Sequence, residues 1–367
     1  MPQARPSPTL TASEDADLGA ALSARVAEAA ARGEPLRLVG GGSKDALAQA
    51  LSGARLDLSG HRGILDYAPS ELVMTARAGT PLAEIEAALA RSRQRLAFEP
   101  PIMSPASTLG GVVAAGLSGA RRPFAGGVRD AVLGVKILDG RGRILRFGGT
   151  VFKNVAGFDA FRLMAGAYGC LGVLLEVSLR VAPAPQTTLH LAFEEAWPRA
   201  KARLEALLRR PVPVTGAVHD GAGLLLRLEG PDHGVRALAA ELGGVVDNSQ
   251  IWEALRQRRY GPHQAARLWR VLIPRRADTA ELEGLAEAPL LRDWAGAEIW
   301  LASEASADRV RDAARRIGGH AALHRGARAG EAVFPPLAPA VLALHQRLKR
   351  ALDPAGVLNP GRLYQEL

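Results

Sequence analysis

The sequence predicts an α+β protein with a larger N-terminal domain, a smaller second domain and a C-terminal segment. Residues 36–182 combine short apolar strands with glycine-bearing loops. At "APAPQTT" (182–188) glycine becomes rarer, and helix and strand patterns alternate from there onward. "FPPLAP" (334–339) then interrupts the chain before a last helical pattern. These changes divide the chain into residues 1–183, 184–334 and 335–367.

The composition is that of an ordinary globular protein, with 48% hydrophobic and 23% charged residues in 367. No apolar run reaches about 18 residues, so no membrane-spanning helix is expected. The N-terminus lacks the apolar segment of a signal peptide. The single cysteine, Cys170, excludes an internal disulfide and a four-cysteine metal or iron–sulfur site within this chain. We therefore expect a reducing, cytoplasmic compartment.

The net charge of +9 is compatible with a nucleic acid, an anionic membrane face, an acidic partner or an anionic ligand. Basic residues are scattered along the chain, with only short clusters such as "RQRRYG" (256–261). A nucleic-acid-binding protein concentrates its basic residues in one stripe or patch. We therefore expect no nucleic-acid partner.

The first elements follow from apolar periodicity and turn residues. A helix is expected to begin at a candidate capping box, Thr11 with Glu14, and to end at Gly33. Thr80 should cap a second helix that has Pro81 at its first position. Short strands are expected between these helices at 36–39, 56–58, 64–67 and 72–77.

Later elements follow in the same way. A hairpin is expected with strands 131–138 and 143–147 around the turn Asp139-Gly140. A short helix at 158–169 and a strand at 171–183 should follow it. Beyond residue 184 the patterns predict helices at 197–210, 307–317 and 340–354, and strands at 223–230 and 298–303.

The loop "VGGGSK" directly follows the first expected strand. Three glycines allow a left-handed turn that presents bare backbone N–H groups, and successive groups of this kind form an anion-binding nest. Ser43 and Lys44 add a hydroxyl and a positive charge. The loop is therefore either a diphosphate cradle or simply a tight turn after a strand. It is not a Walker A loop.

A second glycine-bearing stretch, "STLGGVVAAG" (107–116), predicts a helix that begins at Leu109 behind the caps Ser107 and Thr108. Free N–H groups at such a helix start can bind a phosphate. Glycines in the first turn would let a ligand approach the backbone, although close packing between helix and sheet would also require them. No GxGxxG follows a strand, so a Rossmann site is not expected.

These motifs resemble a known family. "VGGGSK", "ARAGTPLAEIEAAL", "STLGGVVAAGLSGARRPFAGGVRDAVLGVKILDG" and "FKNVAGFDAFRLMAGAYGCLGVLLEVSLRV" occur in the order found in the FAD-binding domain of the vanillyl-alcohol-oxidase and cresol-hydroxylase (PCMH) type. "GLSGARRP", "KNVAGFD" and "DPAGVLNPGRLY" resemble the FAD-binding E subunit of bacterial glycolate oxidase. The resemblance implies a two-subdomain FAD-binding domain, a smaller α+β cap domain, and a C-terminal segment that returns to the FAD domain.

The resemblance also implies where FAD lies. The first loop would hold the diphosphate, with Gly79 and Thr80 close by. The second stretch would line the diphosphate and ribityl chain, Val128 to Asp130 and Val132 would approach the adenosine half, and residues near 153–173 would complete the cleft. The implied cofactor-binding residues are Gly40, Gly41, Gly42, Ser43, Lys44, Gly79, Thr80, Pro105, Ser107, Thr108, Gly110, Gly111, Ala114, Gly116, Val128, Arg129, Asp130, Val132, Lys153, Asn154, Gly157, Gly172 and Val173. Arg121 and Arg122 could face the ligand, a partner or solvent.

Some relatives of this fold attach FAD covalently through His or Cys. The only histidine before residue 190 is His61, outside the phosphate loops. Cys170 is expected to be a small buried thiol. We therefore expect FAD to be bound noncovalently.

Catalytic subunits of the broader family resemble one another in His-bearing motifs of the "HxGDGNxH" and "EHG" types, and this chain has neither. His320 and His324, in "GGHAALHR", are spaced like a helical metal pair, but their surroundings predict a strand, and no metal is expected. The catalytic residues therefore stay unknown at this stage.

The predicted function is an FAD-binding subunit of an oxidase or dehydrogenase for glycolate or another small 2-hydroxy acid. The resemblance implies a sister FAD-binding catalytic subunit, an iron–sulfur subunit, and peripheral association with the inner face of the membrane through these partners. A stand-alone FAD-dependent 2-hydroxy-acid dehydrogenase and a flavin-free structural subunit are the alternatives.

Overall fold

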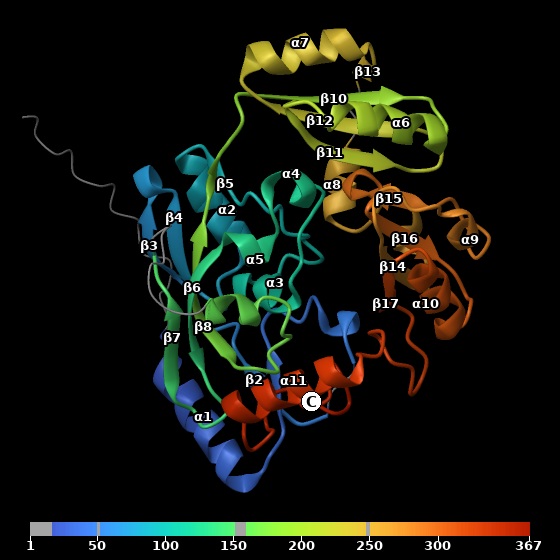
Figure 1. Ribbon diagram of the computed structural model, residues 1–367. Coiled ribbons are helices and arrows are strands. Elements are labelled where there is room, and N and C mark those ends of the chain that lie inside the picture. Colours follow the sequence, from blue (N-terminus) through green and yellow to red (C-terminus); the bar gives the residue numbers. More distant parts are fainter. Residues whose placement is uncertain (1–16, 50–51, 151–158, 247–249) are drawn as a thin grey trace, which may run out of the picture.

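The computed structural model describes residues 17–49, 52–150, 159–246 and 250–367. Figure 1 shows a first part in blue and green and a second part in yellow and orange, each built on its own sheet. The last helix, in red, lies against the first part rather than the second. The fold is therefore α+β, with a C-terminal segment that returns to the N-terminal part.

Helix α1 (Gly19–Arg32) begins the described chain and buries Leu22, Val26 and Ala29. Thr11 and Glu14 lie outside the described residues, and residues 17 and 18 are not helical, so the helix starts later than the capping box predicted. The parallel strands β1 (Leu36–Val39) and β2 (Ala54–Asp57) follow, with the 3-10 turn η1 (Asp45–Leu47) between them.

An antiparallel sheet of five strands, in the order β3-β4-β8-β6-β7, forms the centre of the first part. Helices α2 (Leu82–Arg91) and α3 (Leu109–Ala115) pack their apolar residues against it. The strands are β3 (Ile64–Ala68), β4 (Val73–Arg77), β6 (Val132–Leu138), β7 (Ile144–Gly148) and β8 (Val173–Arg180). The smaller elements are η2 (Pro69–Glu71), α4 (Arg122–Ala125), α5 (Val128–Ala131), η3 (Ala160–Met164), and the strand pair β5 (Gln94–Arg95) and β9 (Ala182–Pro183).

The second part, called the cap below, is an eight-stranded sheet in the order β13-β10-β12-β11-β15-β16-β14-β17. Helices α6 (Trp197–Leu207) and α7 (Asp232–Leu242) cover one half of it, and α10 (Ala307–Arg316) covers the other. The strands are β10 (Thr187–Phe193), β11 (Val214–His219), β12 (Leu224–Gly230), β13 (Val245–Val246), β14 (Leu268–Leu272), β15 (Leu291–Asp293), β16 (Glu298–Ala302) and β17 (His320–Arg325). The short helices are α8 (Ile251–Arg256), η4 (Gly261–Gln264), α9 (Ala280–Glu283) and η5 (Trp294–Gly296).

After the cap, α11 (Pro339–Leu352) leads into a tail that runs beside β1. Leu36 N donates to Val357 O at 2.7 Å, and Asn359 N donates to Leu36 O at 3.0 Å. The tail therefore extends the small parallel sheet from the far end of the sequence, and it brings Asn359 next to the glycine loop that follows β1.

Two local predictions were wrong. Pro81, not Thr80, is the N-cap of α2, because the buried Thr80 hydroxyl bonds the backbone of Gly63 instead. Within the helix predicted at 158–169, Ala160–Met164 form the 3-10 turn η3 rather than an α-helix, and Gly166 and Gly169 then turn the chain with positive φ.

Candidate functional site

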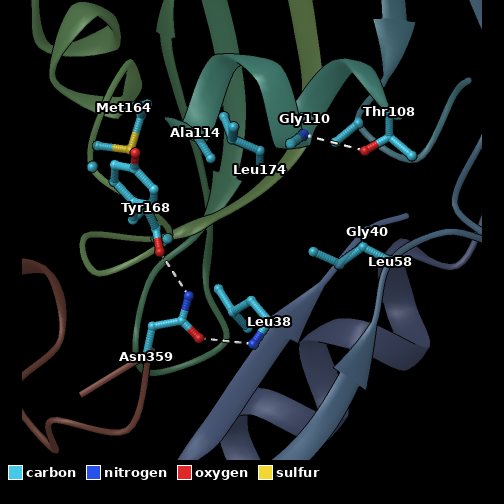
Figure 2. A pocket seen from close by; sticks show the side chains of 15 residues that line it. Leu38, Gly40, Leu58, Thr108, Gly110, Ala114, Met164, Tyr168, Leu174 and Asn359 are labelled. Carbon is cyan, nitrogen blue, oxygen red and sulfur yellow. Dashed lines mark hydrogen bonds between the residues drawn. The ribbon is translucent and has the colours of Figure 1, made fainter. Parts of the chain in front are cut away.

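A cavity lies between the loop after β1 and helix α3. It has two joined chambers of about 540 and 480 Å³, open mouths included. Figure 2 shows Leu38, Gly40 and Leu58 on one side, facing Thr108, Gly110 and Ala114 on the other. One chamber is mostly apolar, and the other is lined by the whole Gly40–Lys44 loop. The cavity therefore combines an apolar compartment with a polar one.

The polar chamber is built to receive an anion. The amides of Gly41, Gly42, Ser43 and Lys44 donate no hydrogen bond to any residue that the structure describes. Lys44 is buried, and within the described ranges its Nζ has only the Ser43 hydroxyl as a partner, at 2.9 Å. Burial lowers the pKa of Lys44 to about 8. Unpaired amides and a desolvated cation at one place favour a bound phosphate or diphosphate.

The start of α3 does not offer the free N–H groups that its sequence suggested. Leu109 N donates to Thr80 O, Gly110 N donates to Ala78 O, and Gly111 N donates to the Thr108 hydroxyl. Thr108 is thus the predicted N-cap, and its side chain satisfies an amide that was expected to face the ligand. Anion binding in this cavity therefore depends on the loop after β1 and on Lys44 rather than on this helix end.

The glycines of the site serve two different purposes. A Cβ at Gly41 would lie 1.6 Å from Ala106 O, and one at Gly110 would lie 2.6 Å from the Ala78 Cβ. These glycines are needed because the protein packs against its own backbone there, which corrects the prediction that Gly110 makes room for a ligand. A Cβ at Gly111 would meet only side-chain atoms, the nearest being Thr108 Oγ1 at 3.2 Å, and Gly111 lines both chambers. Gly111 is therefore the glycine that leaves space in the cavity.

Tyr168 and Asn359, which belongs to the C-terminal tail, form a further wall of the cavity. The Asn359 side chain accepts a hydrogen bond from Leu38 N at 2.8 Å and donates one to Tyr168 O at 2.7 Å (Figure 2). Both residues have positive φ, 49° for Tyr168 and 44° for Asn359. The tail thus fixes the wall of a cavity whose other residues come from the first 175 positions.

A second cavity of about 1310 Å³, open mouth included, adjoins the first at Tyr168 and Ala115. It lies between α5, η3, the cap and the tail, and four arginines line it, Arg122, Arg129, Arg162 and Arg270. The guanidinium groups of Arg122 and Arg270 lie 4.4 and 5.1 Å from the Trp294 ring centre. Arg270 donates to Glu298, whereas Arg122 has no carboxylate partner among the described residues. This cavity is therefore positively charged.

The structure gathers some of the predicted residues and separates others. The first cavity is lined by Gly40, Gly41, Gly42, Ser43, Lys44, Thr108, Gly110, Gly111, Ala114 and Gly172. The second cavity is lined by Gly116, Val128, Arg129 and Asp130. Neither lining includes Gly79, Thr80, Pro105, Ser107, Val132 or Val173, although Ser107 donates to the Ser43 hydroxyl at 3.1 Å. Lys153, Asn154 and Gly157 lie outside the described residues.

Residues of the site that were not predicted are mostly apolar or distant in sequence. They are Leu38, Val39, Asp45, Leu58, Ala78, Ala115, Met164, Ala167, Tyr168, Gly169, Leu174, Asn359 and Arg362. Asn359 and Arg362 belong to the "GVLNPGRLY" segment, which the sequence marked only as part of a resemblance. The aliphatic residues carry no signal that distinguishes them from an ordinary core.

Arg121, Cys170 and His324, which the sequence offered as candidates, all contact other parts of the protein. Arg121 pairs with Glu99 and Glu229 and therefore belongs to the contact between the two parts. Cys170 is buried, as expected, and its thiol donates to Asn359 O at 3.5 Å; burial raises its pKa. His324 lies on β17, as the strand prediction required, and packs edge-on against Trp300. No group of three metal-ligating side chains occurs among the described residues.

Comparison with known proteins defines the class. A family model described as "FAD binding domain" matches residues 19–148, and one described as "FAD linked oxidases, C-terminal domain" matches residues 290–363. The chain is 43% identical over 354 residues to glycolate oxidase subunit GlcE of Escherichia coli (strain K12), which covers 96% of this chain and 99% of that protein. The chain therefore belongs to the FAD-linked oxidases with a PCMH-type FAD-binding domain, in the family of this glycolate oxidase subunit.

Two further likenesses agree with this family. Glycolate oxidase subunit GlcD of Bacillus subtilis (strain 168) is 33% identical over 122 residues, which is 33% of this chain and 26% of that protein. The solved structure of an alkyldihydroxyacetonephosphate synthase aligns with a TM-score of 0.66 at 14% identity, covering 92% of this chain and 74% of that one. The likeness to the synthase structure concerns the fold alone.

The protein is thus an oxidoreductase subunit with FAD as its cofactor. The first cavity fits this cofactor: free amides and Lys44 match a diphosphate, and the apolar chamber matches a flat aromatic ring system. The N-terminal part is accordingly called the FAD domain below.

Proposed function

We propose that this chain is the noncovalent FAD-binding subunit of a complex that oxidises glycolate or another small 2-hydroxy acid. The observation that carries the proposal is the polar chamber, which is lined by four consecutive residues whose amides have no acceptor in the described part of the chain and whose last member is the buried Lys44. FAD supplies a two-electron acceptor for the oxidation of a hydroxyl to a carbonyl. The chain's own residues supply binding, orientation and exclusion of water.

Each part of the cavity has a distinct proposed role. The amides from Gly41 to Lys44 hold the diphosphate, and Lys44 neutralises part of its charge. Ser43 and Ser107 form a hydroxyl pair beside it, which keeps the loop in place. Asn359 holds Leu38 and Tyr168 together, so that the apolar wall stays closed against water.

Noncovalent attachment is supported by the positions of the two candidate side chains. His61 is buried away from both chambers and accepts a hydrogen bond from Leu18 N. Cys170 is equally buried and lines neither chamber. Acid precipitation should release the flavin into the supernatant, and flavin retained in the protein pellet would contradict noncovalent binding.

A division of labour between subunits is the finer part of the proposal. The family's His-bearing catalytic motifs are missing from this sequence, and two of the six histidines in the cap, His263 and His324, are buried against Trp300. The partners would be a sister FAD-binding catalytic subunit and an iron–sulfur subunit that removes electrons. The likeness to two different glycolate oxidase subunits supports a complex of this kind.

The proposed location is the cytoplasm, with contact to the membrane only through partners. Among the described residues, no helix combines the length and the apolar character needed to cross a bilayer. The proposed division of the chain at about residue 184 is supported by the sheets, because β9 closes the first part and β10 opens the second. The proposed division at about residue 334 is supported by its position between the last strand of the cap, β17, and helix α11.

The test is to purify the chain alone and together with its proposed partner subunits. The isolated chain should carry one equivalent of FAD and reduce dyes slowly with glycolate, whereas the complex should turn over rapidly. Rapid glycolate-dependent dye reduction by the isolated chain would reject the division of labour. A colourless protein that takes up no FAD would reject the cofactor role of this chain.

The second cavity favours one other function, a stand-alone 2-hydroxy-acid dehydrogenase. The Arg122 guanidinium, which has no carboxylate partner in the part of the chain that the structure describes, suits the carboxylate of such a substrate. Arg122→Gln would then reduce turnover by the isolated chain and raise KM for glycolate, whereas Arg141→Gln, at an exposed loop, would change neither.

A further inference from the structure

Helix α11 is attached to the protein in an unusual way. Of its fourteen residues only Lys349 is buried. The Lys349 ammonium donates to Cys170 O at 2.9 Å and to Leu358 O at 2.6 Å, and pairs with Asp353. A surface helix of a globular protein normally buries an apolar stripe. Here a buried cation, hydrogen-bonded to backbone carbonyls, holds the helix in place.

Leu352, at the end of α11, packs against the core of the first part, but other apolar residues of the helix are left open to solvent. Leu344 is 60% exposed and Val341 is 41% exposed. With the half-buried Leu348 they follow the i, i+3, i+7 spacing of one helical stripe. Figure 1 shows the helix lying at the outside of the molecule. The stripe has the spacing of anchors that enter a groove on another protein.

The charges beside the stripe indicate the chemistry of that other protein. Arg347 and Arg350 are exposed and have no ion pair among the described residues, and α11 contains no carboxylate. A second copy of this chain would bring the same arginines and a net charge of +9 to the contact. Like charges facing each other disfavour that arrangement. The complementary surface is apolar at its centre and rich in carboxylates at its rim.

The position of the helix connects this stripe to the flavin site. His345, on the next turn from Val341, lines the second cavity together with Tyr364 and Phe334. A protein seated on α11 would therefore lie at the mouth of the cavity that adjoins the FAD cleft.

We propose that α11 is the docking helix for an acidic partner protein, with Val341, Leu344 and Leu348 as apolar anchors and Arg347 and Arg350 as the charged rim. The proposal rests on the proposed function, because it requires that this chain works in a complex. It adds which face the partner covers and the kind of surface that the partner presents.

The test uses the full-length chain co-expressed with the proposed sister flavin subunit and iron–sulfur subunit. The double variant Val341→Asp/Leu344→Asp should weaken assembly on the order of tenfold or more, because buried apolar anchors dominate interface energies. Its FAD content should stay unchanged, which shows that the FAD domain is folded. Leu65→Asp is the matched control, since Leu65 is 38% exposed on β3. Arg347→Glu/Arg350→Glu should weaken assembly most at low salt.

The outcomes of this test distinguish failure of the proposed complex from failure of the docking helix. If the wild-type chain binds FAD but joins neither subunit, the proposed complex and the docking helix both fail. If the complex forms and the Val341→Asp/Leu344→Asp variant assembles with unchanged affinity, the docking helix alone is wrong. If the isolated wild-type chain forms dimers that this variant abolishes, the occupant is a second copy, which also overturns the proposal.

Discussion

Arg227 in the cap donates two hydrogen bonds to the carboxylate of Glu99 in the FAD domain, at 2.7 and 2.9 Å. Both residues are buried, and Arg121 joins Glu99 to a second cap residue, Glu229. The cap is therefore held over the FAD domain by paired charges rather than by apolar contact alone.

We predict that Glu99→Gln lowers the free energy of unfolding by about 3–5 kcal/mol, because it leaves Arg227 buried without a full countercharge. Urea titration of the FAD-loaded protein measures the change. Glu241→Gln is the control, since Glu241 pairs with Arg210 in solvent, and its loss should change the free energy of unfolding far less than the loss of Glu99. Equal effects of the two variants would show that the buried Glu99–Arg227 pair contributes no more to stability than an exposed ion pair.

Asp293 gives a second prediction. Burial, and then the nearby charge of Glu298, raise the pKa of Asp293 from 3.8 to about 7. Between about pH 4 and pH 7 the Asp293 carboxyl is therefore protonated in the folded state but ionised in the unfolded state. Its contribution to the free energy of unfolding is fully present below pH 4 and is lost as the pH rises through about 7. Asp293→Asn should flatten the decline in the free energy of unfolding between pH 4 and 8, measured by urea titration. A variant with the same pH dependence as the wild type would disprove this assignment.

Lys44 should make FAD binding pH-dependent. Because burial lowers its pKa to about 8, the side chain is mostly neutral at pH 9, and a diphosphate placed beside it would raise that pKa again. FAD binding at pH 9 should therefore take up a proton, and affinity should fall as the pH rises above 8. Calorimetry in buffers of different ionisation enthalpy measures the uptake. Lys44→Met should remove it, and a wild-type protein without uptake would contradict the role of Lys44.

The two neighbouring glycines of α3 should respond differently to alanine. Gly110→Ala should lower Tm, because its Cβ would meet the Ala78 Cβ and carbonyl oxygen at 2.6 and 2.9 Å. Gly111→Ala should leave Tm of the FAD-free protein nearly unchanged but weaken FAD binding about tenfold, since the added methyl group enters the cavity. Melting curves and fluorescence titration with FAD check both. The reverse pattern would mean that Gly110 faces the ligand.

Much of the fold followed from local sequence patterns. The strands 64–67 and 72–77 and the hairpin at 131–147 lie within a residue of β3, β4, β6 and β7, because alternating apolar residues between turn residues specify a half-buried strand. The predicted ends of elements were wrong where a tertiary hydrogen bond replaced the expected local one. The Thr80 hydroxyl could cap α2 by its position, but the backbone of Gly63 is its partner in the folded chain.

The sequence by itself determined where the glycine loop proposed to hold the diphosphate lies, because consecutive glycines after a strand and a following Ser-Lys pair are local signals. Only the tertiary structure decided which amides stay free. Those of α3 find acceptors at Ala78 and Thr80, whereas those from Gly41 to Lys44 find none among the described residues. It also decided that Asn359, more than 300 residues away, closes the cavity. The physical reason is that hydrogen-bond satisfaction depends on which groups meet in space, and no local pattern encodes those partners.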